Sequence, residues 1–174
     1  MPAPAGPPDA TGPVIRAAAG DDLHDVVRIW HEGWVDAHVG HVPDALLPHR
    51  QHAHFMQLAQ TRLDTMWVAV VDDVIAGFVV VKRDEVEQLY VDRARRGTGV
   101  AVALLRKAET VIRLGGHGRA WLAVVAGNAR ARAFYERLGW RDAGAMSNQA
   151  LTAAGTLPVP TRRYELEFTL QRLF

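Results

Sequence analysis

The sequence predicts a domain of the α+β class, in which helices and strands are mixed around one sheet, and three observations lead to this prediction. A chain of 174 residues, 49% of them hydrophobic and 22% charged, is long enough to bury one core. Its middle part holds three β-branched runs separated by tight polar turns, which is typical of an antiparallel meander. After the meander, helical and strand patterns alternate. The combination favours a mixed α/β sandwich on a single sheet.

The start of the chain differs in composition from the rest. Residues 1–13 contain five of the nine prolines and show no periodicity, so we expect a disordered tail there and a single domain over residues 14–174. The absence of cysteine excludes disulfides, thiolate metal sites and a cysteine nucleophile. No apolar run approaches the roughly 20 residues that span a bilayer, and no signal peptide opens the chain. We therefore expect a soluble, cytoplasmic protein that does not contact a membrane.

The first elements are predicted to be one short strand and two helices. The apolar pair at residues 14–15 indicates the strand. A helix is expected to begin after Asp21 or Asp22, either of which can cap it, and to run to about Ala37. A second helical stretch is expected over residues 43–62, with a proline in its first turn.

Three strands are predicted next. Residues 67–71 and 74–82 are rich in β-branched side chains and are joined by Asp72 and Asp73, which indicates a hairpin. A third strand over residues 85–91 follows after another short polar turn. Short turns imply antiparallel neighbours, so the first half of the sheet is expected to be a meander.

The second half of the chain returns to helical periodicity. A helix is expected over residues 98–114, a buried strand over residues 120–126, and another helix capped by Asn128. Two closing strands are expected over residues 140–145 and 164–168. The intervening segment is polar and contains Gly and Pro, so it is predicted to be a loop.

The net charge of +1 hides two segments of opposite sign. Residues 21–54 carry six acids against two arginines, and also seven of the eight histidines, whereas residues 92–142 carry eleven bases against four acids. One end of the molecule is therefore expected to prefer cations and the other anions. A basic segment is typical of a protein that binds nucleic acid or a phosphate-rich ligand.

The most specific feature is the run Arg96-Gly97-Thr98-Gly99-Val100-Ala101 at the start of a predicted helix. A helix N-terminus has unpaired N–H groups and a partial positive charge, so it can bind phosphate through the main chain alone. The glycines remove Cβ atoms that would keep phosphate away, and Arg93, Arg95 and Arg96 are expected to add positive charge at the rim. The alternative is a strand-to-helix turn with incidental arginines.

Two familiar phosphate-binding motifs fit this run poorly. A P-loop needs Gly-Lys-Ser/Thr, and the two lysines, Lys82 and Lys107, lie elsewhere. A dinucleotide fingerprint is nearly met, but Val102 replaces its third glycine and the predicted meander does not suit that fold. A nicotinamide-dependent reductase is kept as an alternative behind the two hypotheses below.

The segment from Leu89 to Leu105 resembles the acetyl-coenzyme A signature of the GNAT family of N-acetyltransferases, Arg/Gln-x-x-Gly-x-Gly/Ala, with Arg96, Gly99 and Ala101 at its fixed positions. The resemblance covers about residues 14–168. It implies the GNAT fold, a central, mostly antiparallel sheet of roughly six to seven strands with one parallel, splayed strand pair, flanked by about four helices. A second family signature, Asn-x-x-Ala-x-x-Phe-Tyr-Glu-x-x-Gly-Phe, is similar to the pattern Asn128, Ala131, Phe134, Tyr135, Glu136, Gly139 and Trp140.

The resemblance implies that acetyl-CoA is the acetyl donor. Its pantetheine arm would bind the backbone of Leu89, Tyr90 and Val91, and one of these amides would also polarise the thioester carbonyl. Asn128 would contact the pantetheine arm, although its role as a helix N-cap is sufficient by itself. The negatively charged phosphates of acetyl-CoA would account for the positive charge of residues 92–142, so no nucleic-acid partner is expected. The diphosphate would bind Arg96, Gly97, Thr98, Gly99, Val100 and Ala101.

Acetyl transfer to an amine also requires a base and an acid. A free alkyl amine has a pKa near that of lysine, about 10.4, so it must lose a proton at neutral pH. Glu85 and Glu87 lie at i and i+2, are expected to share one face of their strand with Leu89 and Val91, and either could serve as the base, or both could be a solvated strand end. The family commonly uses a tyrosine at the place of Tyr135 to protonate the leaving thiolate, while the alternative is that Tyr135 only extends a buried stripe.

The resemblance places the acceptor site at residues 30–47 and in the loop over residues 146–160. The negative segment would attract a cationic amine there. Trp30 and Trp34 could offer a cation–π face, although their helical spacing suits a core better.

Three histidines in the negative segment, His49, His52 and His54, superficially suggest a metal site. His52 and His54 lie on different sides of a helix and have no evident carboxylate partner, so no metal is expected. Their protonation below about pH 6.5 would instead weaken the binding of a cationic acceptor.

The leading hypothesis is therefore an acetyl-CoA-dependent N-acetyltransferase that acts on a primary amine of a small molecule or peptide by direct transfer in a ternary complex. The alternative is a non-catalytic acyl-CoA-binding or regulatory domain of the same fold. A homodimer formed by the closing strands across a two-fold axis is compatible with either hypothesis.

Overall fold

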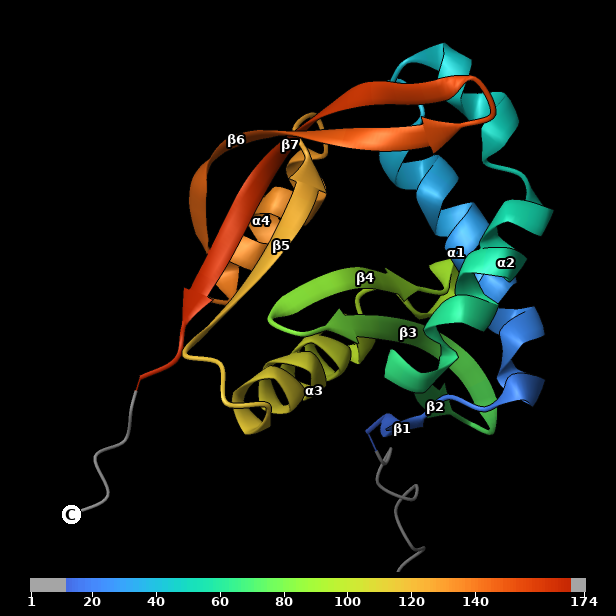
Figure 1. Cartoon of the computed structure of the whole chain (residues 1–174). Helices are drawn as coiled ribbons and strands as arrows, with labels where there is room; N and C mark the ends of the chain where they lie inside the picture. The colour runs from blue at the N-terminus through green and yellow to red at the C-terminus, as the bar shows by residue number, and fades with distance from the viewer. Residues whose placement is uncertain (1–11, 170–174) are drawn as a thin grey trace, which may run out of the picture.

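One seven-stranded sheet organises the structure, a computed structural model that describes residues 12–169 (Figure 1). The strands are β1 (Val14–Ala17), β2 (Met66–Val71), β3 (Val74–Lys82), β4 (Glu85–Val91), β5 (Arg119–Val125), β6 (Arg141–Thr152) and β7 (Gly155–Glu167). They lie side by side in the order β1-β2-β3-β4-β5-β7-β6, and every neighbouring pair is antiparallel except β4 and β5. The predicted fold class is thereby confirmed. The predicted disordered tail lies outside the described residues, apart from its last two.

Within residues 12–169, four α-helices and four short 3₁₀ helices connect the strands. The α-helices are α1 (Leu23–His38), α2 (His52–Arg62), α3 (Val100–Leu114) and α4 (Ala129–Arg137). The 3₁₀ helices are η1 (Gly20–Asp22), η2 (Asp44–His49), η3 (Leu63–Thr65) and η4 (Arg93–Arg95). No helix among the described residues is long and apolar enough to cross a membrane.

The first half of the chain follows the prediction with one correction. Helix α1 and the meander β2-β3-β4 are confirmed, and Asp72 and Asp73 form the hairpin turn with φ angles of 50° and 60°, as a turn that matches the twist of a hairpin requires. The second helical stretch is divided into η2 and α2. Pro48 lies within η2, where it cannot donate a backbone hydrogen bond, and Gln51 is extended before α2 begins.

The predicted loop between the two closing strands is wrong. Residues 146–160 instead extend β6 and β7 into one long antiparallel hairpin, paired from Arg141–Glu165 to Thr152–Gly155. Two prolines suggested a loop, but Pro160 accepts the amide of Ala126 on its β5 side, so its nitrogen also points to that side, beyond the end of β5. Pro158 shares this direction by the strand period of two, so the ladder to β6 loses no donor. Dimer formation through these strands stays a prediction.

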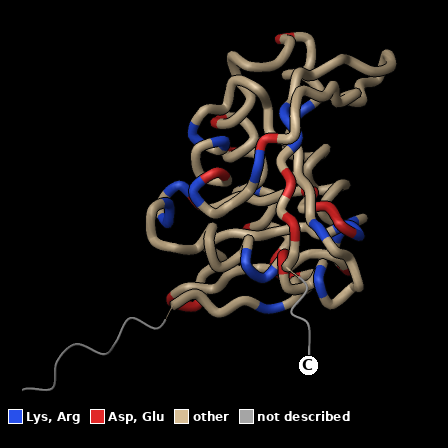
Figure 2. The backbone as a smooth tube through the Cα atoms, turned by 90° about the vertical axis from the view of Figure 1, so that its left-hand side faces the viewer, with Lys and Arg blue, Asp and Glu red and all other residues tan. Residues whose placement is uncertain are grey.

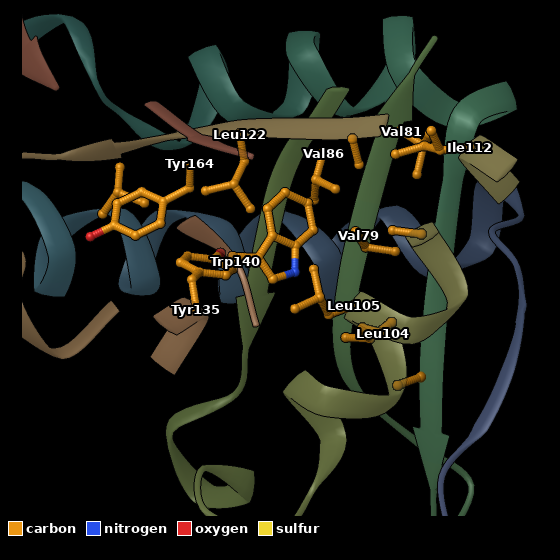
Figure 3. Packing of buried hydrophobic residues seen from close by; sticks show 14 of the residues in the cluster. Val79, Val81, Val86, Leu104, Leu105, Ile112, Leu122, Tyr135, Trp140 and Tyr164 are labelled. Atoms are coloured by element: carbon orange, nitrogen blue, oxygen red, sulfur yellow. The ribbon is translucent and has the colours of Figure 1, made fainter. Parts of the chain in front are cut away.

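The sheet separates two hydrophobic cores. One lies under α3 and α4, where Trp140 is 2% exposed and packs among Val86 of β4 and Leu105 of α3 (Figure 3). Glu109, a buried acid in this core, accepts a hydrogen bond from the Trp140 indole nitrogen at 3.1 Å and pairs with Arg106. The second core lies under α1 and α2 and is built around Trp30 and other aromatic side chains. Each core therefore belongs to one helical layer.

Candidate active site

Strands β4 and β5 part almost as soon as they meet. Their parallel ladder contains one residue pair, Glu85 with Trp121, supported by a hydrogen bond from the Trp121 amide to the carbonyl of Asp84 at 2.9 Å. Figure 1 shows the two strands diverging from this point. On the other side of β4, the Asp92 amide donates to β3 at 2.8 Å. Because backbone direction alternates along a strand, the amides of Leu89 and Val91 point away from β3 and into the gap.

A bulge in β4 corrects the predicted arrangement of its side chains. Val80 pairs with Gln88 and Val81 pairs with Val86, so Glu87 is an extra residue on β4. The alternation therefore changes phase there. Leu89 and Val91 share the α3/α4 core with Val86, whereas Glu85 and Glu87 lie on the opposite, α1/α2 face. The prediction that all four side chains share one face is wrong.

The turn between β4 and α3 has the form that main-chain anion binding requires. Gly97 and Gly99 have φ angles of +74° and +88°, which only glycine adopts readily, and no atom lies within 4 Å of where a Cβ would stand. Within the described chain, no hydrogen bond is formed by the amides from Gly97 to Val102. These amides open α3, where the helix dipole adds positive charge. The arrangement can hold a diphosphate through the backbone.

The rim arginines are not free charges, contrary to the prediction. Arg93 and Arg96 both bind Asp36 of α1, each at 2.7 Å, and Arg95 binds Asp72 at 3.1 Å. These arginines hold the pKa of Asp36 well below its usual range, chiefly through the hydrogen bond from Arg93. Figure 2 shows basic and acidic segments lying next to each other along the backbone. The negative and positive segments of the sequence therefore neutralise one another in part.

A cavity of about 560 Å³ lies beside this turn. Gly127 forms part of its wall, and a Cβ at that position would overlap the His41 ring, so the ring can lie where it does only because residue 127 is glycine. Asn128 caps α4 by accepting the Ala131 amide at 3.1 Å, which confirms its role as an N-cap and leaves its side-chain nitrogen available. The cavity is lined by Asp36, Ala37, His41, Arg93, Arg96, Gly127, Asn128, Ala129 and Arg130.

A second cavity of about 460 Å³ follows the gap between β4 and β5, and the two predicted carboxylates differ in it. Glu87 is held by Arg62 of α2 through two hydrogen bonds of 2.9 and 3.2 Å. Glu85 is half-buried and has no ion-pair partner in the described part of the chain. Burial, together with the charge of Glu87, raises the pKa of Glu85. Glu85 is therefore the carboxylate that is better suited to accept a proton.

Tyr135 belongs to the buried stripe and also borders the second cavity. Its ring is only 9% exposed and packs against Trp140 and Tyr164 in the α3/α4 core (Figure 3). Its hydroxyl forms no hydrogen bond within residues 12–169, yet no fully buried side-chain oxygen there lacks a partner, so the hydroxyl must reach the cavity that Tyr135 lines. Burial raises the pKa of Tyr135, so this hydroxyl keeps its proton at neutral pH.

The far end of the second cavity is formed by α1, η2, α2 and the tip of the β6-β7 hairpin, which arches over these helices in Figure 1. Trp30 and Trp34 are 2% and 7% exposed and belong to the α1/α2 core, as their spacing favoured, although both also border the cavity. Trp34 stacks on His38 with ring centroids 4.6 Å apart. Residues 30–47 and the hairpin tip thus meet, as the resemblance implied, but through a strand pair rather than a loop.

No group of three metal-ligating side chains occurs among residues 12–169. His54 lines the second cavity, whereas His52 lies near His31 on another side of the helix. Sequence reasoning missed Asp36, Arg50 and Arg62, which lie within the two cavities. Their roles depend on partners 25 to 101 residues away, and no local motif marks them.

The sequence matches the model of the acetyltransferase (GNAT) family over residues 24–140. No curated protein sequence matches the chain. Similar solved structures include a GCN5-related N-acetyltransferase from Rhodopseudomonas palustris, with a TM-score of 0.70, 17% identity and coverage of 92% of this chain and 100% of that one.

Two further solved structures contain coenzyme A or its acetyl ester. The protein yncA from Salmonella typhimurium, solved with its cofactor acetyl-CoA, has a TM-score of 0.67, 17% identity and coverage of 91% of this chain and 95% of that one. The PaiA N-acetyltransferase of Thermoplasma acidophilum, in complex with coenzyme A, has a TM-score of 0.63, 18% identity and coverage of 91% and 100%. At these identities the likeness shows the shared fold.

Proposed function

Because this chain belongs to the GNAT acetyltransferase family, we propose that it transfers the acetyl group of acetyl-CoA to a primary amine by direct attack in a ternary complex. The observation that carries this proposal is the parting of β4 and β5 directly beside the unpaired amides of residues 97–102. This arrangement offers an extended arm a strand edge to bind and offers the adjoining diphosphate a helix N-terminus. The strand edge of β4 and the N-terminus of α3 follow one another, so a single extended ligand could contact both.

The residues present fit acetyl-CoA along this strand edge and helix N-terminus. The amides from Gly97 to Ala101 would hold the diphosphate, and Arg96 would join them once it exchanges Asp36 for a phosphate oxygen. The amides of Leu89 and Val91 would bind the pantetheine arm, with Tyr90 between them forming part of the wall. Asn128 would contribute its free side-chain nitrogen. When bound, the donor supplies an activated acetyl thioester, and a β4 amide would stabilise the charge that develops on its oxygen.

Glu85 is assigned the role of the base. Its raised pKa and lack of an ion-pair partner among the described residues suit it to take a proton from the acceptor ammonium, directly or through water. Glu87, whose charge is engaged by Arg62, would shape the site by holding α2 against β4 and by raising the pKa of its neighbour. The two carboxylates thus take different parts.

Tyr135 is assigned the role of the acid. The hydroxyl carries its proton at neutral pH, as a general acid must, and its raised pKa makes it a weaker donor than an exposed tyrosine. The leaving thiolate of a coenzyme A-type thiol has a pKa in the range of free cysteine, about 8.5, so protonation drives its departure. With no cysteine in the chain to form an acyl-enzyme, attack by the amine on the bound thioester is the simplest route.

The test is the release of free thiol from acetyl-CoA in the presence of a panel of primary amines. In Tyr135→Phe we expect turnover to fall by about a hundredfold, with the affinity for acetyl-CoA measured by calorimetry unchanged. Tyr164→Phe is the matched control, because Tyr164 is a neighbouring buried tyrosine that bonds Glu136 at 2.8 Å and does not line either cavity. It should lower the melting temperature and leave turnover nearly unchanged.

Two outcomes would contradict the proposal. Equal turnover in Tyr135→Phe and the unmodified protein would remove Tyr135 from the chemistry. Tight binding of acetyl-CoA without acetylation of any amine would favour a non-catalytic acyl-CoA-binding domain.

A further inference from the structure

The hydroxyls of the chain's three tyrosines have different surroundings. The hydroxyl of Tyr164 is used within the protein, because it donates to Glu136 at 2.8 Å and accepts from Arg132 at 3.2 Å. The hydroxyls of Tyr90 and Tyr135 form no hydrogen bond with any described residue, and both side chains line the second cavity. Tyr135 is the proposed acid. The hydroxyl of Tyr90 therefore needs an explanation of its own.

The ring of Tyr90 is held on the α1/α2 side of β4. It packs against Phe78, with ring centroids 5.9 Å apart, and against Trp30 at 6.4 Å. Gly33 of α1 lies over the ring, and a Cβ at that position would overlap it. The φ angle of Gly33 is not positive, so its backbone does not require glycine, and glycine weakens a helix. The close approach of the Tyr90 ring thus explains why residue 33 is glycine.

Tyr90 leaves β4 where the thioester is proposed to bind. It lies between Leu89 and Val91, whose amides face the gap. Its hydroxyl must reach the cavity, since no fully buried side-chain oxygen within residues 12–169 lacks a partner. Burial raises the pKa of Tyr90, and the charge of Tyr135 adds to this effect, which falls with distance. Because Tyr135 belongs to the α3/α4 core and Tyr90 packs against the α1/α2 core, their hydroxyls enter the cavity from opposite faces of the sheet.

We propose that Tyr90 orients the acceptor, in that its neutral hydroxyl accepts a hydrogen bond from the amine nitrogen and so directs the nitrogen lone pair at the thioester carbon. This assignment rests on the proposed function, since it concerns the acceptor of that reaction. Tyr135 then acts on the leaving sulfur from the α3/α4 face, and Tyr90 acts on the attacking nitrogen from the α1/α2 face.

A neutral hydroxyl suits this task better than a charged group. An attacking amine must present its lone pair to the carbonyl carbon, so a neighbouring group can bind its N–H groups but not the lone pair. A hydroxyl oxygen has two lone pairs that can accept such an N–H. A carboxylate would favour the protonated amine, which has no lone pair to offer.

Packing alone does not account for the hydroxyl. A phenylalanine would fill the same space against Phe78 and Trp30, whereas a largely enclosed hydroxyl without a protein partner costs free energy. A ligand that supplies the missing hydrogen bond recovers this cost. The hydroxyl is therefore better explained by what binds in the cavity than by the core beneath it.

The principal variant is Tyr90→Phe, which removes the hydroxyl and keeps the ring. Hexylamine, phenethylamine, spermidine and glycinamide are tested as acceptors, and the fastest is used for steady-state rates. We expect kcat/KM for the amine to fall by about tenfold, while the calorimetric affinity for acetyl-CoA changes less than about twofold. Tyr164→Phe is the matched control, because it removes a hydroxyl that lines neither cavity, and it should leave kcat/KM nearly unchanged.

Two further comparisons separate orientation from packing. Gly33→Ala keeps the hydroxyl but displaces the ring, and should lower kcat/KM for the amine about fivefold. Gly20→Ala is its control, since no atom lies within 4 Å of that Cβ and the φ of Gly20 is not positive. The double variant of Tyr90→Phe with Tyr135→Phe should lose the product of the two single losses, because the two hydroxyls act on different atoms.

Binding is measured apart from chemistry. Each amine is titrated by calorimetry into protein saturated with coenzyme A, and the tightest-binding amine should bind Tyr90→Phe at least about threefold more weakly than the unmodified protein. Melting curves report whether each variant still folds.

The outcomes are distinct. An unchanged kcat/KM in Tyr90→Phe, or a double variant no slower than Tyr135→Phe, would overturn the assignment while leaving acetyl transfer intact. Weaker binding of the amine to Tyr90→Phe, with no acetylation by any form of the protein, would support the Tyr90 contact and contradict the proposed function. Absence of binding by every amine would contradict both.

Discussion

The proposed donor side and the proposed acceptor side of the molecule are formed by different chemical groups. On the donor side, the turn before α3 offers main-chain amides, and its geometry is set by Gly97 and Gly99 within six residues of sequence. On the acceptor side, the cavity is formed by side chains from α1, η2, α2, β4 and the β6-β7 hairpin. Arg50, for example, is fixed by a carbonyl 101 residues away.

This difference predicts that substitutions on the two sides have different effects. A site made of backbone tolerates many side chains as long as the turn keeps its φ angles. A site made of side chains can change its ligand through one substitution without disturbing the fold. We therefore expect substitutions on the donor side to affect every acceptor equally, and substitutions on the acceptor side to alter preference or chemistry.

The largest effect is expected at Glu85. Glu85→Gln should lower kcat by about a hundredfold near neutral pH, because the base that receives the ammonium proton is removed. Rate profiles against pH check this directly. In the unmodified protein activity should rise with pH through the raised pKa of Glu85, and in the variant this limb should disappear.

Glu87→Gln is the control variant for Glu85→Gln. It breaks the pair with Arg62 and should reduce stability, but kcat should fall by less than about tenfold. A larger loss at Glu87 than at Glu85 would reverse the assignment of the two carboxylates.

A smaller effect is expected from the donor turn. Gly99→Ala forces a side chain into φ +88° and should cost roughly 1–2 kcal/mol of folding stability. It should also weaken acetyl-CoA binding about tenfold by shifting the amides, as measured by calorimetry. Gly116→Ala is the control, since Gly116 has φ +86°, equally open surroundings and no place in the turn. Loss of affinity in both variants would mean that strain alone is responsible.

The smallest effect is expected where the two sides meet, at Asp36. Because its folded-state pKa lies well below that of an unfolded aspartate, about 3.9, the stabilisation it provides is complete above that value and is lost as the pH falls further. Asp36→Asn should therefore melt a few degrees lower at neutral pH, and the difference should shrink below about pH 4. Melting curves from pH 2.5 to 7 check this. A constant difference across that range would show that charge is not the cause.

The turns and the helix cap near the proposed donor site could be predicted from sequence because their causes are local. The acid pair at residues 72–73 indicates a turn, Asn128 indicates a helix cap, and Gly97 and Gly99 directly before an apolar helix indicate an anion cradle. Each signal acts within a few residues, so no knowledge of the tertiary structure is required.

The remaining features depend on contacts that the sequence does not display. The pairing of Arg96 with Asp36 joins residues 60 apart, and it partly neutralises the expected surplus of positive charge. Pro158 and Pro160 suggested a loop because their harmless orientation depends on where β5 ends. Arg50 looks like any surface arginine until the hairpin tip covers it.

The extra residue in β4 has a consequence for anyone who redesigns this protein. At this bulge the alternation of side chains changes phase. Odd-numbered residues lie on the α1/α2 face up to Glu87 and on the α3/α4 face after it. If the strand kept its length but lost the bulge, regular alternation would turn Glu85 into the α3/α4 core beside Leu89 and Val91, and would place Val86 on the α1/α2 face. An ionised acid without a partner would be strongly destabilising there. The bulge at Glu87 thus allows Glu85 to face the cavity while Leu89 and Val91 remain in the α3/α4 core.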